Sequence, residues 1–327
     1  MRPWRLRGEI SLKRSRKIYP LNRYRDFNSY LREIFGERIQ KIALDAGLGC
    51  PNRDGTISKD GCIYCDGRGA GTGAMIYSGI SIEDQIAGGR AYLSNRFKAK
   101  KFIAYFQSFS NTYGPLPKLK ALYDQALAHK DIVGLSVATR PDCVDRDILS
   151  LIGSYKDDHL VWIEYGLQSA HDKTLRLINR GHDVACLERS VVLANEYGIN
   201  ICIHVILGLP DETRPMMLET ARFLARLPIQ GIKLHMLYVV EGTRLAELYK
   251  RGEVLCLERE EYAELVVDFL ELLPPNMVIQ RLTGDPIKSE LIAPAWAGEK
   301  TKNLRIIREA LERRNAWQGR LTDLSRR

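Results

Sequence analysis

The 327-residue sequence predicts an α/β fold in which six parallel strands, each followed by a helix, form a partial barrel. From residue 40 onward, short runs rich in β-branched residues alternate six times with helical patterns, as in a parallel sheet with crossover helices. Six such units are too few for a closed eight-stranded barrel. The apolar content of 45% is enough to bury a large core.

The predicted elements follow one another in a regular order. The strands are expected at residues 40–46, 102–107, 132–138, 160–166, 200–207 and 231–238. The helices are expected at 81–96, 117–129, 145–154, 172–197 with a break near Gly181, 214–227 and 243–251. Beyond residue 252 we expect an acidic helix at 258–273, a short strand in MVIQRL and a basic last helix. The expected domains are a basic N-terminal extension at 1–39, the barrel at 40–252 and a C-terminal α/β extension at 253–327.

The net charge of +9 is concentrated at the two ends of the chain. Residues 1–26 carry nine Lys and Arg against two acids, and residues 300–327 carry nine against three, which leaves the middle at −4. These ends either form one basic surface for nucleic acid or are solvated tails. Aromatic residues among the N-terminal cations favour RNA because such rings stack on bases: Trp4, Tyr19, Tyr24 and Tyr30.

The chain shows no targeting or membrane signal. It contains no run of about 18 apolar residues, and its Arg-rich first 25 residues lack the apolar block of a signal peptide. We expect a cytoplasmic protein with no membrane contact.

Seven cysteines form an odd set, which argues against a disulfide framework. Four of them are scattered singly and are interpreted as buried structural thiols: Cys143, Cys186, Cys202 and Cys256.

Polar residues recur on one face of four predicted strands. Alternate residues of a strand point to opposite sides, so one face of each strand looks into the barrel. Each polar residue alone fits a hydrogen-bonded core position, but six together favour a ligand cavity. The six are Asp45, Glu164, Gln168, His204, Lys233 and His235.

Three clustered cysteines follow the first predicted strand, in the segment GCPNRDGTISKDGCIYC. Cys50, Cys62 and Cys65 therefore lie at the carboxyl end of a strand, where parallel barrels build their active sites. Three thiolates bind either zinc or an iron–sulfur cluster, and structural zinc needs a fourth protein ligand. No histidine precedes His129 in the sequence, so a zinc site would need a distant ligand such as Cys143 or His204.

The ordered motifs CPNRDGTxxxxGCxYC, YFQSFSNTYGP, LSVATRPDCV, WIEYGLQSAHDKTL, HVILGLPDET and IKLHMLYVVEGT resemble the radical S-adenosylmethionine (SAM) superfamily. Within it, the sequence is most similar to the YhcC-like proteins and the radical SAM domain of the Elongator catalytic subunit. The resemblance implies a partial (β/α)6 TIM-type barrel in which Cys50, Cys62 and Cys65 ligate one [4Fe–4S] cluster. It also implies reductive cleavage of SAM to a 5′-deoxyadenosyl radical that abstracts a hydrogen atom from a substrate.

The resemblance assigns further residues by motif position. Tyr64 is expected near the adenine of SAM, and Gly208 brings backbone close to it. The SAM methionine and ribose are expected against Ser136, Arg140, Glu164 and Gln168, with a Glu164–Arg140 ion pair as the alternative. The usual Gly-Gly-Glu segment that holds the SAM amine is absent, and Gln107, Ser108 and Asn111 occupy its place. The residues left to face the substrate are His204, Lys233 and His235.

Three functions are considered, the first two implied by the resemblance. The first is a monomeric tRNA-modifying enzyme, a transferase or an oxidoreductase acting at the wobble uridine and reduced by an electron donor such as flavodoxin or ferredoxin. The second is a radical SAM enzyme for a small metabolite or a protein. The third is a non-enzymatic, zinc-stabilised nucleic-acid-binding module.

Overall fold

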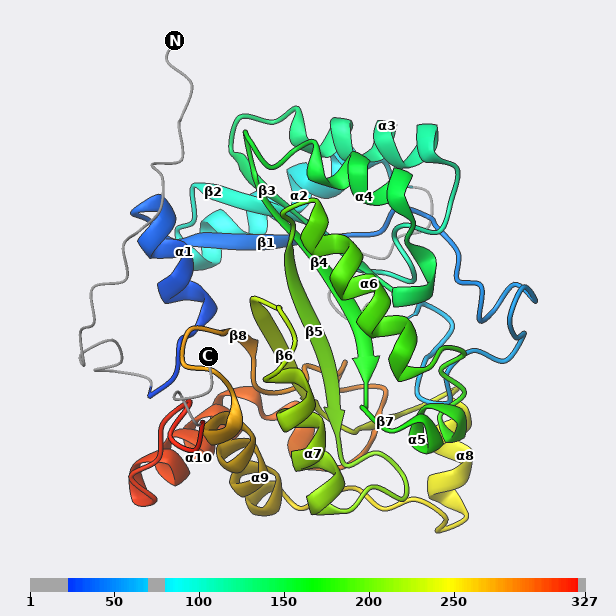
Figure 1. Cartoon of the computed structure of the whole chain (residues 1–327), viewed down its shortest axis with the longest axis vertical. Coiled ribbons are helices and arrows are strands. Elements are labelled where there is room, and N and C mark those ends of the chain that lie inside the picture. The colour runs from blue at the N-terminus through cyan, green and yellow to red at the C-terminus, as the bar shows by residue number, and fades with distance from the viewer. Residues whose placement is uncertain (1–22, 70–79, 323–327) are drawn as a thin grey trace.

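A curved parallel sheet forms the centre of the molecule (Figure 1). The computed structural model describes residues 23–69 and 80–322. Seven strands pair in parallel in the order β1-β2-β3-β4-β5-β6-β8, so β1 and β8 are the sheet edges and the barrel is partial, as predicted. The strands are β1 (Ile39–Leu44), β2 (Lys101–Phe106), β3 (Ile132–Thr139), β4 (Leu160–Gln168), β5 (Asn200–Leu207), β6 (Gly231–Met236) and β8 (Val278–Arg281).

Helices connect successive strands and cover the outside of the sheet (Figure 1). The predicted break in the longest helical pattern is confirmed: Gly181 adopts φ +77° between α5 and α6, a backbone conformation that glycine tolerates best. The connecting helices are α2 (Ile82–Phe97), α3 (Leu116–Leu127), α4 (Arg146–Gly153), α5 (Asp172–Leu177), α6 (Val184–Glu196) and α7 (Arg214–Leu224), with a short 3-10 helix η1 (Pro141–Cys143) before α4.

Strand alternation separates an apolar outer layer from a polar interior. In β4, Ile163 and Tyr165 pack in the main hydrophobic core beneath the helices, while Glu164 points into the barrel. Burying such large apolar side chains stabilises the sheet by roughly 1.5–3 kcal/mol each. The register of the parallel strands therefore carries polar side chains inward, as the sequence predicted.

The segment after residue 252 completes the sheet instead of standing apart from it. β8 pairs in parallel with β6 and supplies the seventh strand. The remaining elements are β7 (Val239–Val240), which pairs with β9 (Leu291–Ala293), the helices α8 (Arg244–Lys250), α9 (Arg259–Leu272) and α10 (Lys300–Arg313), and the 3-10 helix η2 (Ala295–Gly298). The boundaries at residues 39 and 252 stay a prediction, and the segments on either side of them pack together.

The described part of the N-terminal extension is packed against the barrel. Helix α1 (Phe27–Phe35) places the Tyr30 ring edge-on to Trp162, with 5.9 Å between the centroids. The Arg25 guanidinium lies 5.3 Å from the centre of the same ring. Tyr30 is therefore part of the barrel floor, and its expected role as a base-stacking residue is wrong. Tyr24 is also partly buried against the core, whereas Trp4 and Tyr19 lie outside the described residues.

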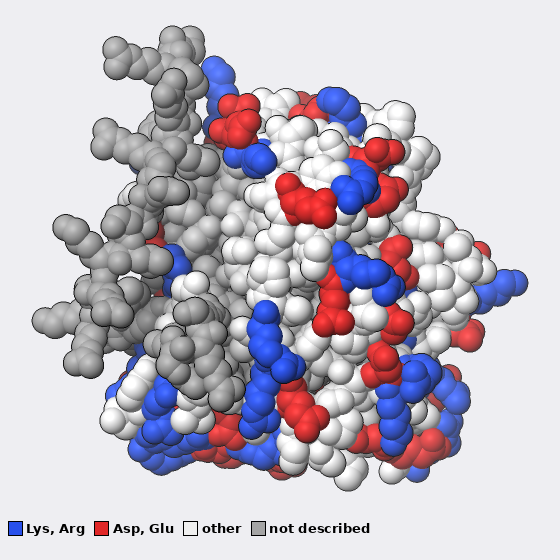
Figure 2. Space-filling model, viewed as in Figure 1, with Lys and Arg blue, Asp and Glu red and all other residues white. Residues whose placement is uncertain are grey.

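The two ends of the described chain do meet. The Gln318 side-chain oxygen accepts a hydrogen bond of 2.9 Å from the Arg25 backbone N–H, and the Gln318 backbone donates to the Arg23 carbonyl. Many cations near the C-terminus pair with acids of α9: Arg314, for example, lies 2.6 Å from Asp268 and 2.9 Å from Glu271. Figure 2 accordingly shows positive and negative side chains intermingled over the visible face.

Among the described helices, none is long and apolar enough to span a membrane.

Candidate active site

A cavity of about 170 Å³ opens at the carboxyl ends of the barrel strands. It brings together the three clustered cysteines and the polar interior of the barrel, although these come from separate parts of the chain. Its walls include Cys50, Cys62, Tyr64, Cys65, Tyr105, Gln107, Arg140, Glu164, Gln168, Arg180, His204, His235 and Arg281. This is the position expected for the active site of a parallel barrel.

The cysteine loop is held in a defined shape. The Cys65 N–H donates to the Cys62 carbonyl over 3.0 Å, and the Arg53 guanidinium bonds the Asp66 carbonyl over 2.8 Å. Gly69 adopts φ +73°, and a Cβ there would lie 3.0 Å from the Phe109 backbone nitrogen. The loop therefore follows the β2–α3 connection closely, and a larger residue at position 69 would force the two segments apart.

Two hydrogen-bond donors point at the Cys62 sulfur. Asn52 Nδ2 lies 3.6 Å from it, and Arg180 Nη1 lies 3.5 Å from it. The rest of the Arg180 guanidinium is fixed by the Gly166 carbonyl, which it bonds over 3.0 Å and 2.6 Å. Such donors stabilise a thiolate and the sulfur of a bound cluster. Three thiols on one cavity, with a cation behind one of them, form a donor set that fits an iron–sulfur cluster.

No zinc site is assembled around this cavity, because the group of described His, Cys, Asp and Glu residues close enough to share one metal ion contains none of the three clustered cysteines. Cys143 is buried in η1 and is not part of the cavity wall. His204 lines the cavity, and its Nε2 is hydrogen-bonded to Glu164 over 2.8 Å, which leaves only its Nδ1 for a metal ion. Burial and the neighbouring Cys62 raise the pKa of Cys65 to about 12, so metal binding here must release a thiol proton.

Glu164 is the centre of a buried network at the base of the cavity. Its Oε1 accepts from Lys41 and Ser136, each over 2.5 Å, and its Oε2 accepts from Lys233 and from His204. A carboxylate offers about four acceptor positions, so these four donors saturate it. Glu164 therefore does not pair with Arg140, and that alternative is wrong. Arg140 pairs with Asp142 over 2.7 Å instead.

The protonation states of the network follow from burial and charge. Burial would raise the pKa of Glu164, but Lys233 and Lys41 outweigh it and hold that pKa well below the usual range. Burial lowers the pKa of His204 to about 4 and that of Lys233 to about 7, in each case against the opposing effect of Glu164. His204 is therefore neutral at pH 7 and donates its Nε2 proton to the carboxylate.

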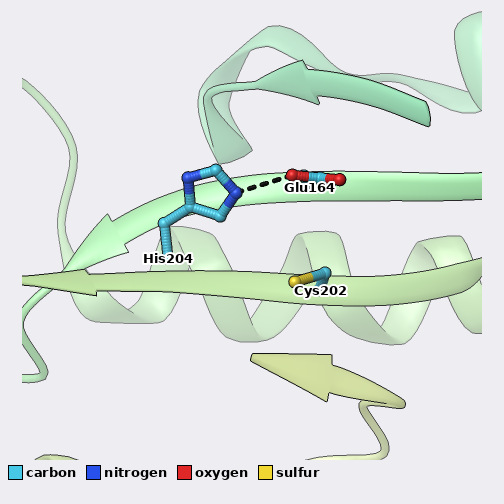
Figure 3. Close-up of side chains that lie close together, drawn as sticks. All are labelled: Glu164, Cys202 and His204. Carbon is cyan, nitrogen blue, oxygen red and sulfur yellow. Dashed lines mark hydrogen bonds and ion pairs between the residues drawn. The ribbon is translucent and has the colours of Figure 1, made fainter. Parts of the chain in front are cut away.

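Glu164, Cys202 and His204 also place one possible metal ligand each within 4.8 Å of one another. Figure 3 shows the His204 ring directed at the Glu164 carboxylate, with Cys202 on the same strand as His204. A divalent cation here would meet the ammonium groups of Lys41 and Lys233 on the same carboxylate. We therefore interpret the trio as part of the hydrogen-bonded network and not as a metal site.

The residues predicted to contact SAM divide into two groups. Those on the cavity wall are Tyr64, Gln107, Arg140, Glu164 and Gln168. Arg140 is 2% exposed, and its Nη1 has no hydrogen-bond partner among the described residues. The others lie behind the wall: Ser136 bonds Glu164, Asn111 bonds the Ala138 carbonyl, Ser108 is buried, and the Gly208 N–H bonds the Met217 sulfur.

The residues predicted to face the substrate occupy different depths. His204 and His235 line the cavity, with ring centroids 5.8 Å apart. Lys233 lies deeper, where it bonds Glu164 and donates to the Tyr105 hydroxyl over 3.1 Å. Asp45, the sixth polar residue expected in the ligand cavity, lies just beyond β1 and outside the cavity wall, so that expectation is wrong; its carboxylate accepts the Gly47 N–H.

Sequence reasoning missed four residues of the site. Lys41 shares with Asp45 the expected inner face of the predicted strand 40–46, so strand alternation could have identified it. Tyr105 lies on β2, and Arg281 lies on β8. Arg281 was missed because its strand was predicted to belong to the C-terminal extension and not to the barrel. Arg180 comes from the segment NRGHD between α5 and α6, and no periodic pattern indicates that it reaches Cys62.

Sequence comparison defines the class of this partial-barrel protein. The radical SAM superfamily model matches residues 47–224, and the radical SAM C-terminal domain model matches residues 229–313. The chain therefore belongs to the radical SAM superfamily. As a member of this superfamily it uses a [4Fe–4S] cluster and SAM, as predicted.

Two full-length relatives place the chain more narrowly. It is 40% identical over 301 residues to YtqA of Bacillus subtilis, covering 91% of this chain and 92% of YtqA. It is 39% identical over 271 residues to YhcC of Escherichia coli K12, covering 83% of this chain and 86% of YhcC. The chain is thus a YhcC-like radical SAM protein.

Two further similarities cover parts of longer proteins. The chain is 31% identical over 176 residues to the tRNA uridine(34) acetyltransferase of Dehalococcoides mccartyi, covering 53% of this chain and 37% of that protein. The solved structure of Elp3 from Methanocaldococcus infernus matches with a TM-score of 0.63 at 16% identity, covering 86% of this chain and 64% of that one. This structural match shows a shared fold.

Proposed function

We propose that this radical SAM enzyme modifies tRNA, with the wobble uridine as its target. The observation that carries the proposal is the 31% identity over 176 residues to a tRNA uridine(34) acetyltransferase, a stretch that covers 53% of this chain. The cavity adds chemical support, because it joins the cysteine loop to a barrel interior rich in hydrogen-bond donors. Such donors suit the carbonyl and phosphate oxygens of a nucleotide.

In this proposal the chain's own residues hold the two cofactors. Cys50, Cys62 and Cys65 ligate the cluster, and Arg180 and Asn52 stabilise the Cys62 sulfur. When bound, the reduced cluster and SAM supply the radical that abstracts a hydrogen atom from the substrate.

The groups around SAM come from three strand ends. The Arg140 Nη1, which has no partner among the described residues, binds a carboxylate or hydroxyl oxygen of SAM, while Tyr64 and Gln168 line the same wall. Gln107 takes the place of the usual amine-binding segment.

The substrate is expected on the side of the cavity formed by β5, β6 and β8. His235 lines this side, and burial together with the charge of Arg281 lowers its pKa well below the usual value. A neutral imidazole there offers one N–H donor and one acceptor to a base edge. Glu164 is a positioning residue, since it fixes His204 and both lysines.

The direct test compares tRNA nucleosides by mass. Anaerobically purified protein is reduced with dithionite and incubated with SAM and tRNA from a strain lacking the gene, and Cys62→Ala serves as the control. The proposal predicts a new mass on a uridine of the anticodon loop only with the intact protein. No SAM-dependent change in any nucleoside would contradict it. Filter binding to total tRNA at two salt concentrations should also show weaker binding at high salt.

A small metabolite or a protein is the second candidate substrate. The ion pairs of Arg314 with Asp268 and Glu271 favour it, because they remove positive charge from the described C-terminal surface. Deleting residues 1–17 separates the two candidates. Unchanged turnover of a defined small substrate by the truncated protein would favour the metabolite, whereas loss of tRNA binding would favour tRNA. In either case the enzyme needs an electron donor, for which we propose flavodoxin or ferredoxin.

A further inference from the structure

A second cavity of about 200 Å³ lies beside the first, at the open edge of the barrel. It is bounded by α1 and by the two edge strands, β1 and β8. Lys41 joins the edges, because its Nζ bonds the Gln280 side-chain oxygen over 2.8 Å. Tyr105, Gln107 and Arg281 line both cavities, so the second cavity continues from the proposed active site.

The acceptor groups on this side of the barrel are already occupied. Glu164 accepts four hydrogen bonds, two of them from the ammonium groups of Lys41 and Lys233. Asp285, at the rim of the second cavity, is paired with Lys300 over 2.6 Å. The Glu164 carboxylate is therefore saturated, and the negative charge of Asp285 is already paired.

Two donor groups of the second cavity are unoccupied. Arg281 pairs through its backbone in β8, but its guanidinium forms no hydrogen bond and no ion pair with any residue in the described ranges, although it lines both cavities. The buried Nε2 of Gln280 also has no partner there. Its orientation follows from Lys41, which donates only and must therefore face the Gln280 oxygen. Both open positions thus require an acceptor.

The charges agree with the hydrogen bonding. The single interior carboxylate, that of Glu164, faces three cationic side chains: Lys41, Lys233 and Arg281. The buried histidines are neutral and add no positive charge. This leaves an excess of positive charge inside a low-dielectric barrel. Burial, with Lys41 and Arg281 adding to it, lowers the pKa of Lys233 to about 7 even against Glu164. A bound anion would relieve this excess.

We infer that Arg281, at the junction of the two cavities, binds an anionic group of the substrate, a phosphate or a carboxylate, with the Gln280 amide as a second donor. A guanidinium presents paired N–H groups that match the oxygens of either group. This inference deepens the proposed function, since it rests on the same barrel holding the substrate. It identifies Arg281 as a substrate-binding residue.

The test measures anion binding to the full-length, cluster-loaded protein with SAM present. Inorganic phosphate and acetate are titrated separately by calorimetry into the wild type, Arg281→Gln and Arg281→Lys. Arg222→Gln, on the exposed side of α7, is the matched control. We expect Arg281→Gln to weaken binding at least about tenfold, as for a lost charge-assisted hydrogen bond, with Arg281→Lys intermediate and Arg222→Gln unchanged. Preference for phosphate or for acetate then identifies which group the substrate carries.

Three results would overturn the inference. One is that neither anion binds, and another is that Arg281→Gln binds both as the wild type does. The third is that Arg281→Gln weakens binding of SAM itself, which would assign Arg281 to the SAM carboxylate. Iron content and the unfolding midpoint of each variant verify that it is folded. The test needs neither tRNA nor turnover. Its result can therefore still be interpreted if tRNA proves not to be the substrate.

Discussion

The Nε2 of His204 on β5 lies 2.8 Å from Oε2 of Glu164 on the neighbouring strand β4. Glu164 is fully buried, and Lys41, Lys233 and Ser136 complete its hydrogen bonding. One carboxylate thus holds together side chains from β1, β3, β5 and β6, beneath the cavity that receives the cysteine loop. The stability of the barrel interior and its response to pH both depend on this group.

Neutralising Glu164 should destabilise the protein strongly. In Glu164→Gln, two ammonium groups and a histidine remain buried without their anion. Removing one partner of a buried ion pair lowers the free energy of unfolding by about 3–5 kcal/mol in other proteins. Urea unfolding followed by circular dichroism measures the loss. The control is Glu196→Gln, which breaks an exposed pair with Arg146 and should leave the midpoint nearly unchanged. Equal midpoints for Glu164→Gln and the wild type would show that the network does not stabilise the fold.

The pH dependence of stability should carry the signature of His204. Burial lowers its pKa to about 4 in the folded protein, against about 6.5 in the unfolded chain. The unfolded chain therefore binds more protons between these values, and stability falls as the pH falls from about 6.5 to about 4. His204→Gln removes this contribution, so its free energy of unfolding should vary less with pH across that window. His129→Gln, after α3, is the control, and equal slopes for His204→Gln and the wild type would contradict the assignment.

The pairing of β3 with β4 should tolerate no side chain at position 134. A Cβ on Gly134 would lie 2.6 Å from the Leu160 backbone oxygen, which cannot move without disturbing the ladder. Gly134→Ala should therefore cost about 1–3 kcal/mol, as overpacking does in other cores. Gly67→Ala is the control, since its Cβ would meet no atom of the described residues within 4 Å. A thermal midpoint for Gly134→Ala as high as that of Gly67→Ala would refute this account of the packing.

Much of the barrel could be predicted because its signal is local. Strand predictions such as 102–107 and 200–207 lie within a residue or so of β2 (Lys101–Phe106) and β5 (Asn200–Leu207). Alternation along β4 and β5 then placed Glu164 and His204 inside the barrel. β8 was expected as a strand but not as the seventh strand of the sheet, because its partner β6 is separated from it by α8 and α9.

The partners of the polar residues could not be predicted in the same way. Lys41 and Glu164 are 123 positions apart, and only the curvature of the open sheet brings them together. Motif position likewise does not show which residues reach the cavity: Arg140, directly after β3, lines it, whereas Ser136 on β3 is covered by Glu164. Tyr30 resembled an RNA-stacking residue in sequence because its neighbours are cations, yet it packs on Trp162.

Reductive cleavage of SAM depends on the cluster that we propose Cys50, Cys62 and Cys65 to hold. The most direct measurement is the amount of 5′-deoxyadenosine formed by the dithionite-reduced, anaerobically reconstituted protein. The wild type and Cys256→Ala, whose thiol lies off the cavity wall, should form it at equal rates, and Cys62→Ala at least about 100-fold more slowly. Product formation by Cys62→Ala at the wild-type rate, or a wild-type protein that binds zinc and no iron, would contradict the claim.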